Sequence, residues 1–233
     1  MRTRVITLIA AVLIPILTRA MEDHTSQLFH MIEFETDMGT TRHGARLAWD
    51  LDGWIGTDNH KLWLKSEGIS LDGHTPDQAE YWVMYSHTID TFWDMQWGVR
   101  YDDTPHSTSY LTMGFDGLAP YSFETEAHVF VSDEGNISAR IREKKDFLIT
   151  QNLITQPYLE INLSAQDIKK EQTGAGVTDG YIGLQTRYEF SRKFAPYLDI
   201  RYEQPLGETS TLAKKYGNDQ HDAIASVGVR FMF

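Results

Sequence analysis

The chain of 233 residues contains no cysteine. This absence excludes a disulfide-bonded scaffold, a cysteine nucleophile, a zinc–thiolate site and an iron–sulfur cluster. Basic residues are also few, because 21 Lys and Arg stand against 33 Asp and Glu and leave a formal net charge of -12. So acidic a chain repels phosphate groups, and we therefore expect no nucleic-acid partner and a preference for cations.

Long apolar runs are missing beyond the N-terminus. A helix that spans a bilayer needs about 18 or more apolar residues, so a polytopic helical membrane protein is excluded. The N-terminus itself carries Arg2 and Arg4, a mostly apolar stretch over residues 5–17, and the tripeptide Thr18-Arg19-Ala20. This pattern predicts a secretory signal peptide over residues 1–20, cleaved after Ala20. The alternative, an N-terminal membrane anchor, has too short an apolar stretch to span a bilayer.

From Leu28 onward the dominant period of the sequence is two. In residues 93–101 every second side chain is large and apolar, and the residues between them are polar or glycine. Such alternation is typical of β-strands. We expect twelve of them, at residues 28–37, 43–52, 60–69, 79–87, 91–102, 108–116, 121–131, 137–150, 154–167, 179–190, 194–204 and 222–233.

The strands predict an all-β fold, but a period of two does not say which face meets water. In a soluble sandwich or a lipocalin-like barrel the apolar face points to the core. Here the polar face carries many charges of both signs, short and long connections alternate, and the chain ends on an apolar–polar strand with a terminal Phe233. Aromatic residues also cluster near the predicted strand ends, as interfacial girdles do: Trp49, Trp54, Trp63, Tyr81, Trp93, Tyr101 and Tyr121. We therefore predict a transmembrane up-and-down antiparallel β-barrel of about 12 strands over residues 28–233.

Several segments carry a family resemblance. Residues 47–58 (LAWDLDGWIGTD), 61–68 (KLWLKSEG), 92–102 (FWDMQWGVRYD), 117–121 (GLAPY) and 187–197 (RYEFSRKFAPY) resemble the copper resistance protein B family of bacterial outer membranes. The resemblance implies an outer-membrane barrel that binds copper and contributes to copper resistance by sequestration or export. It also implies a periplasmic multicopper oxidase as a partner. Members often carry a long Met- and His-rich segment before the barrel, whereas here only residues 21–27 occupy that place.

Copper ligands in a chain without cysteine must come from Met, His and carboxylates. The alternation directs one set of such side chains into the lumen: Met31, Glu33, Glu35, Met84, Glu126 and His128. Near the N-terminus, His24 and His30 are further candidates. The alternative is that Met31 and Met84 fill gaps in a packed interior and that His128 belongs to a polar network. His60 and His87 are expected to be ordinary solvated residues at turns.

Three function classes remain for such a barrel. The first is copper binding, and the second is a general porin or small-solute channel. The third is an outer-membrane enzyme, which we reject because no Gly-x-Ser-x-Gly elbow or convincing triad occurs. The many lumenal charges could form a cation path, but they more readily form an ion-pair lattice that fills a barrel of this size, since open aqueous channels usually need about 16 strands.

Overall fold

The computed structural model describes residues 27–233, apart from residues 43, 72, 74, 169–172 and 217–220. The predicted signal peptide over residues 1–20 lies outside the described residues, as does nearly all of the segment 21–27, so both stay predictions. The predicted barrel, residues 28–233, lies within the described part of the chain.

Most described residues belong to strands, because the alternating pattern suits a pleated backbone with one apolar and one polar face. The strands are β1 (Phe29–Thr41), β2 (Gly44–Gly56), β3 (His60–Leu71), β4 (Gln78–Asp90), β5 (Trp93–Thr104), β6 (Thr108–Ala119), β7 (Phe123–Ser132), β8 (Ile137–Lys144), β9 (Phe147–Leu148), β10 (Leu153–Ser164), β11 (Gly176–Tyr188), β12 (Phe194–Pro205) and β13 (Asp222–Met232). A 3-10 turn, η1 (Pro120–Ser122), joins β6 to β7, and one helix, α2 (Gly207–Tyr216), precedes β13.

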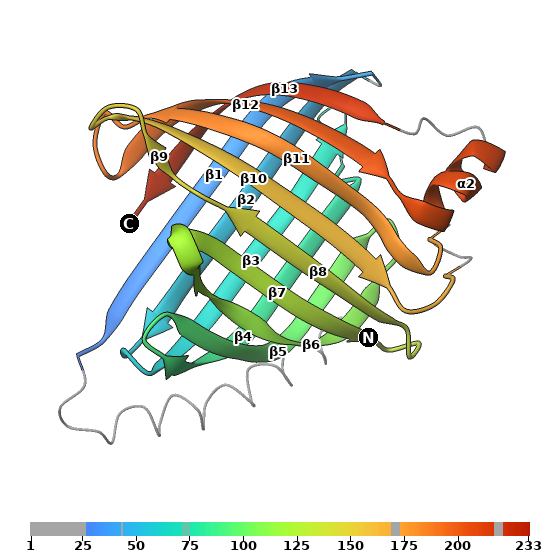
Figure 1. Ribbon diagram of the computed structural model, residues 1–233, viewed down its shortest axis with the longest axis horizontal. Coiled ribbons are helices and arrows are strands. Elements are labelled where there is room, and N and C mark those ends of the chain that lie inside the picture. The colour runs from blue at the N-terminus through green and yellow to red at the C-terminus, as the bar shows by residue number, and fades with distance from the viewer. Residues whose placement is uncertain (1–26, 43, 72, 74, 169–172, 217–220) are drawn as a thin grey trace.

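The strands form one closed sheet in which sequence neighbours pair antiparallel (Figure 1). The last strand, β13, pairs with β1, with Glu33 opposite Met232 and Thr40 opposite Ala225. This pairing leaves the sheet without a free edge, as a structure that crosses a bilayer requires. Since β8 and β9 are two parts of one crossing strand, the predicted twelve-stranded up-and-down barrel is confirmed.

The interruption between β8 and β9 has a local cause on the neighbouring strand. Lys145 donates its backbone N–H to the Pro157 carbonyl at 3.2 Å. Proline has no N–H to return the second bond of that pair, so the ladder cannot continue regularly there. Asp146 follows Lys145 and points inward, where it accepts hydrogen bonds from Gln156 and Arg187.

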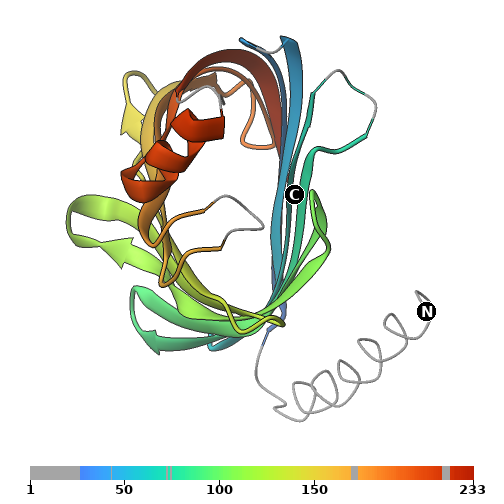
Figure 2. The ribbon, with the colours of Figure 1, turned by 90° about the vertical axis from the view of Figure 1, so that its right-hand side faces the viewer.

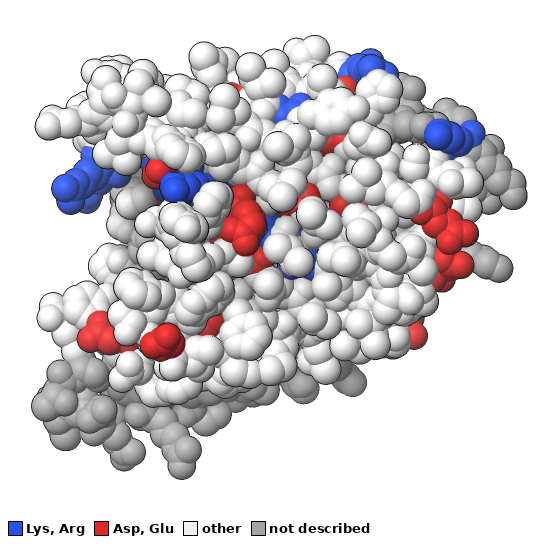
Figure 3. All heavy atoms as spheres, viewed as in Figure 1, with Lys and Arg blue, Asp and Glu red and all other residues white. Residues whose placement is uncertain are grey.

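The barrel has its apolar side chains outside. On β6, Leu111 is 67% exposed whereas its neighbour Thr112 is only 4% exposed, and the same alternation runs through most strands. On the face drawn in Figure 3, most atoms are neither acidic nor basic. Glu143 is an exception on the lipid side, where the Thr125 hydroxyl donates to its carboxylate at 2.8 Å.

The two rims of the barrel differ. The rim that carries the two ends of the barrel, which we call the termini rim, has short turns such as residues 57–59 and 91–92. The opposite rim carries the longer connections and α2, which lies beside β11 and β12 (Figure 2). Short turns face the periplasm in bacterial barrels, so the termini rim is the periplasmic one.

Two expectations need correction. One of the long connections expected from the sequence, between the last two predicted strands, is not a plain loop but contains α2, whose start at Gly207 has a φ of 52°. Trp54 and Trp63 do not belong to the outer aromatic girdle, because Trp63 packs against the buried Trp82 and Met84 inside the barrel and Trp54 lies 6.3 Å from Trp63. Among the described residues, no helix is both long and apolar enough to cross a membrane.

Candidate functional site

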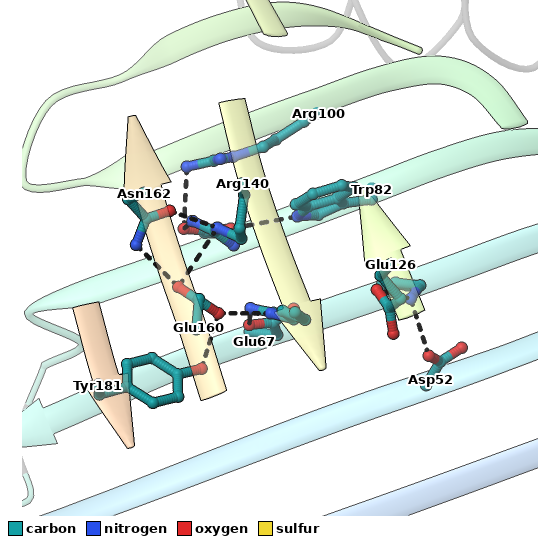
Figure 4. Close-up of polar contacts among 12 residues, drawn as sticks. Asp52, Glu67, Trp82, Arg100, Glu126, Arg140, Glu160, Asn162 and Tyr181 are labelled. Carbon is teal, nitrogen blue, oxygen red and sulfur yellow. Dashed lines mark hydrogen bonds and ion pairs between the residues drawn. The ribbon is translucent and has the colours of Figure 1, made fainter. Parts of the chain in front are cut away.

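The lumen is crossed by ion pairs that join strands from opposite walls. Arg142 on β8 makes a two-pronged contact with Glu67 on β3, with N–O distances of 2.6 and 2.5 Å. Strands β3 and β8 are not neighbours in the sheet, so this pair spans the interior (Figure 4). Arg142 also donates to Glu160 on the adjacent β10 at 2.5 Å. Planar guanidinium groups suit such bidentate contacts with carboxylates.

A second crossing pair is centred on Glu80 of β4. Arg140 of β8 donates to both of its carboxylate oxygens, at 3.0 and 2.9 Å, and Arg100 of β5 donates at 2.9 Å. The indole N–H of Trp82 donates to the same carboxylate at 3.2 Å. Both guanidinium groups also lie over the Trp82 ring, at 5.4 and 5.7 Å from its centroid.

The third crossing contact is made by Lys65 on β3. Its ammonium group lies 3.0 Å from Asp52 on the neighbouring β2 and 2.8 Å from Glu126 on β7 across the lumen. Lys65 is 5% exposed, and a buried ammonium group is tolerated only when carboxylates compensate it. The expected ion-pair lattice is therefore present, and it links the two walls at three places.

Between these contacts remains a cavity of about 870 Å³ whose lining reaches the α2 rim at His106, Asn136 and His221. Carboxylates outnumber basic side chains along its wall. The acidic residues whose side chains point inward are Glu33, Glu35, Asp37, Asp50, Asp52, Glu67, Glu80, Asp102, Glu124, Glu126, Glu160, Asp179, Asp199, Glu203 and Asp222, and the basic ones are Arg46, Arg100, Arg140, Arg142, Lys144 and Arg201. This excess of negative charge in a narrow space attracts cations and repels anions.

The structure places two predicted ligands, Met84 and His128, at one aromatic cluster inside the barrel. Met84 has no exposed surface and packs with Trp82 and Phe130. The His128 ring meets Trp82 edge-on at 5.4 Å between centroids. Its Nε2 donates to the Gln96 side-chain oxygen at 3.0 Å, so the lone pair of the ring is on Nδ1. The Met84 thioether and the His128 imidazole therefore both lie at the Trp82 ring. This arrangement also fits the alternative, in which Met84 fills a gap in a packed interior and His128 belongs to a polar network.

The other predicted ligands are dispersed. Glu33 forms an ion pair with Arg230, Glu35 accepts a hydrogen bond from Gln185 at 3.0 Å, and Glu126 is paired with Lys65. Met31 lies in register with Trp54 near the termini rim, His30 is exposed there, and His24 lies outside the described residues. Within the described part of the chain, no three His, Asp or Glu side chains are spaced to hold one metal ion. A copper site among the described lumenal residues would therefore need a methionine thioether as a ligand or a rearrangement of the ion pairs.

Sequence reasoning missed two features of the site. It gave no signal that β3 meets β7 and β8 across the lumen, because alternation places side chains inward without saying which opposite strand they reach. It also gave His60 and His87 no role, although the register of β3 and β4 sets them opposite each other. The available signal was that His60 begins one predicted strand and His87 lies near the end of the next, so antiparallel pairing brings the two together.

Comparison with known proteins shows which family the chain is similar to. A family model described as copper resistance protein B precursor matches residues 26–233. Copper resistance protein B of Escherichia coli is 40% identical over 187 residues, which cover 80% of this chain and 63% of that protein. A homolog from Pseudomonas syringae pv. tomato is 35% identical over 191 residues, covering 82% of this chain and 65% of the homolog. The chain therefore spans less than two thirds of the length of these relatives.

Solved structures agree on the fold. The NanC porin superposes with a TM-score of 0.58 at 10% identity, covering 85% of this chain and 98% of the porin. The KdgM porin in complex with disordered oligogalacturonate gives a TM-score of 0.54 at 10% identity, covering 87% of this chain and 99% of the porin. The protein is thus an outer-membrane β-barrel, and by the family match over nearly all of its described residues it belongs to the copper resistance protein B family.

Proposed function

We propose that the barrel binds copper ions in its lumen and contributes to copper resistance by sequestering them or exporting them across the outer membrane. The observation that carries the proposal is the acidic cavity, which borders at Phe130 an aromatic cluster where a thioether and an imidazole are buried. Copper(I) prefers thioether and imidazole donors, and copper(II) accepts imidazole and carboxylate. Both kinds of donor face the same interior.

The proposal includes no catalytic step, and copper is the cargo rather than a resident cofactor. A periplasmic multicopper oxidase is the proposed protein partner, since the family resemblance implies one and the termini rim of the barrel faces the periplasm. The general porin is the weaker candidate, because three ion-pair contacts join the opposite walls and narrow the passage.

Copper retention by the purified barrel tests the proposal. We expect retained copper to fall in Met84→Leu, which keeps the side-chain volume but removes the sulfur, and in His128→Gln. Met113→Leu is the matched control, because Met113 is 50% exposed on the lipid side and should change nothing. If both lumenal variants retain as much copper as the unaltered chain, the proposed lumenal ligands are wrong.

A further inference from the structure

Outside the lumen, three side chains with metal-binding atoms meet at the termini rim. His60 at the start of β3 lies directly opposite His87 on β4, and their rings are 4.8 Å apart between centroids with 17° between the planes. Tyr85, two residues before His87 on the same face of β4, brings its phenol oxygen to 2.5 Å from His60 Nδ1. None of the three takes part in the ion-pair lattice of the lumen.

Because hydrogen bonds occupy the Nδ1 atoms of His60 and His87, their Nε2 atoms are available to bind a metal ion. His87 Nδ1 donates to the backbone carbonyl of Asn59 at 3.1 Å, so the lone pair of this ring is on Nε2. Histidines that bind metals commonly donate their other N–H to a backbone carbonyl in this way, which fixes the tautomer and the ring. When Tyr85 accepts from His60 Nδ1, His60 also presents the lone pair of Nε2.

The supporting backbone is ordered by contacts across the turn of residues 57–60. Thr57 N–H donates to the His60 carbonyl at 2.8 Å, and Thr88 N–H donates to the Asn59 carbonyl at 3.0 Å. The Tyr85 ring packs against Trp97 at 4.8 Å between centroids. The two imidazoles and the phenol are therefore held by strands rather than by a long loop, which favours a defined site.

We propose that His60 and His87 form an external binding site for one copper(II) ion at the periplasmic rim, with Tyr85 holding the His60 ring through its Nδ1. Two imidazole nitrogens are donors that suit the tetragonal geometry of copper(II). The rings now lie face to face, so binding requires a rotation of His60 about its Cβ–Cγ bond, a torsion with a broad energy minimum. The choice of metal rests on the proposed function, whereas the donor cluster itself does not.

The position of the site indicates its use. It lies on the outer wall at the rim, so an ion held there does not have to enter the lumen. With only two imidazole ligands from the protein, the site is expected to exchange copper readily with the periplasm. The site would bind copper(II) transiently at the surface of the barrel, separately from the lumen that contains the thioether.

Electron paramagnetic resonance during titration of the folded barrel with copper(II) chloride tests the site. We expect a saturable signal with hyperfine splitting from two nitrogens, and at least a tenfold weaker affinity in His60→Gln and in His87→Gln. Tyr85→Phe should weaken binding by about 10- to 100-fold, the usual effect of removing a partner that orients a metal-bound histidine. His106→Gln, an exposed histidine near the opposite rim, is the matched control.

A second measurement uses the unaltered chain and so does not depend on the folding of variants. Copper(II) should protect His60 and His87, but not His106, from modification by diethyl pyrocarbonate. Equal modification with and without copper(II), or an unchanged two-nitrogen signal in both histidine variants, overturns the site. The lumenal variant Met84→Leu should leave this signal intact, so failure of the lumenal proposal is distinguishable from failure of the rim site.

Discussion

At the scale of single residues, the interior of this barrel is held together mainly by charges, beside one small aromatic cluster around Trp82 and Phe130. Arg142 forms ion pairs with two carboxylates, that of Glu67 across the lumen and that of Glu160 on the next strand. Removing one member of a buried ion pair is far more costly than the pair is stabilising, because the partner stays behind without compensation. The sequence predicted which charges face inward, since alternation alone decides that, but it did not predict their partners.

We expect Arg142→Met to destabilise the barrel by about 3 kcal/mol. This value is at the lower end of the range for removing one partner of a buried ion pair, because the side chains of Arg142 and Glu67 keep some exposure. Urea unfolding of the barrel in detergent micelles measures the change. Arg192→Met is the matched control, since Arg192 is exposed at a turn of the termini rim, and it should shift the free energy of unfolding by less than about 0.5 kcal/mol. Equal effects of the two substitutions would contradict the role of the lattice.

At the scale of strands, a glycine allows a contact that skips one strand. Tyr158 on β10 is in register with Gly183 on β11, and its hydroxyl donates to Asp199 on β12 at 2.7 Å. A Cβ atom at Gly183 would overlap the Tyr158 ring, so only glycine lets this ring lie across β11. Aromatic side chains often cover glycines of a neighbouring strand in this manner.

Gly183→Val should destabilise the barrel by about 1–3 kcal/mol, because it displaces the Tyr158 ring and breaks its bond to Asp199. Tyr158→Phe removes that bond alone. If the two changes act on one contact, the double variant will be less unstable than the sum of the single variants. Strict additivity in the unfolding free energies would show that the contact across β11 does not stabilise the barrel.

The strands themselves were predictable, and their irregularities were not. Period-two patterns located all twelve crossings because lipid requires an apolar outer face on every strand. The break between β8 and β9 depends on Pro157 of the facing strand, so the segment that breaks contains no sign of it. The helix α2 has few apolar residues, and its position beside β11 and β12 is a tertiary feature that a local pattern does not encode.

At the scale of the whole molecule, the crossing ion pairs decide whether the barrel conducts. The pairs at Arg142, Arg140 and Lys65 join opposite walls, whereas pairs such as Arg201 with Glu203 stay on one wall. The acidic excess along the cavity should make any current that passes selective for cations. The sequence predicted the narrow, charged lumen from strand number and alternation, but the copper donors of the site stay predictions because ligand geometry depends on how distant strands meet.

We expect the intact barrel to pass only a small current in planar bilayers. Replacing both Glu67 and Arg142 by Ala should raise the single-channel conductance, because a cross-lumen contact is removed, and the reversal potential should indicate cation selectivity. The double replacement of Arg201 and Glu203 by Ala is the control and should leave the conductance nearly unchanged. A steady large current through the unaltered protein would favour the porin.

The pairing of β13 with β1 has a consequence for biogenesis. The final residues of the chain complete the wall, so a nascent or truncated polypeptide that lacks them would expose two open backbone edges to hydrocarbon, where nothing can satisfy them. Insertion must therefore wait until synthesis and export have delivered the C-terminus. Until then the polypeptide has to be kept unfolded and soluble in the periplasm. The apolar side chains that later face lipid have to be shielded so that the polypeptide does not aggregate.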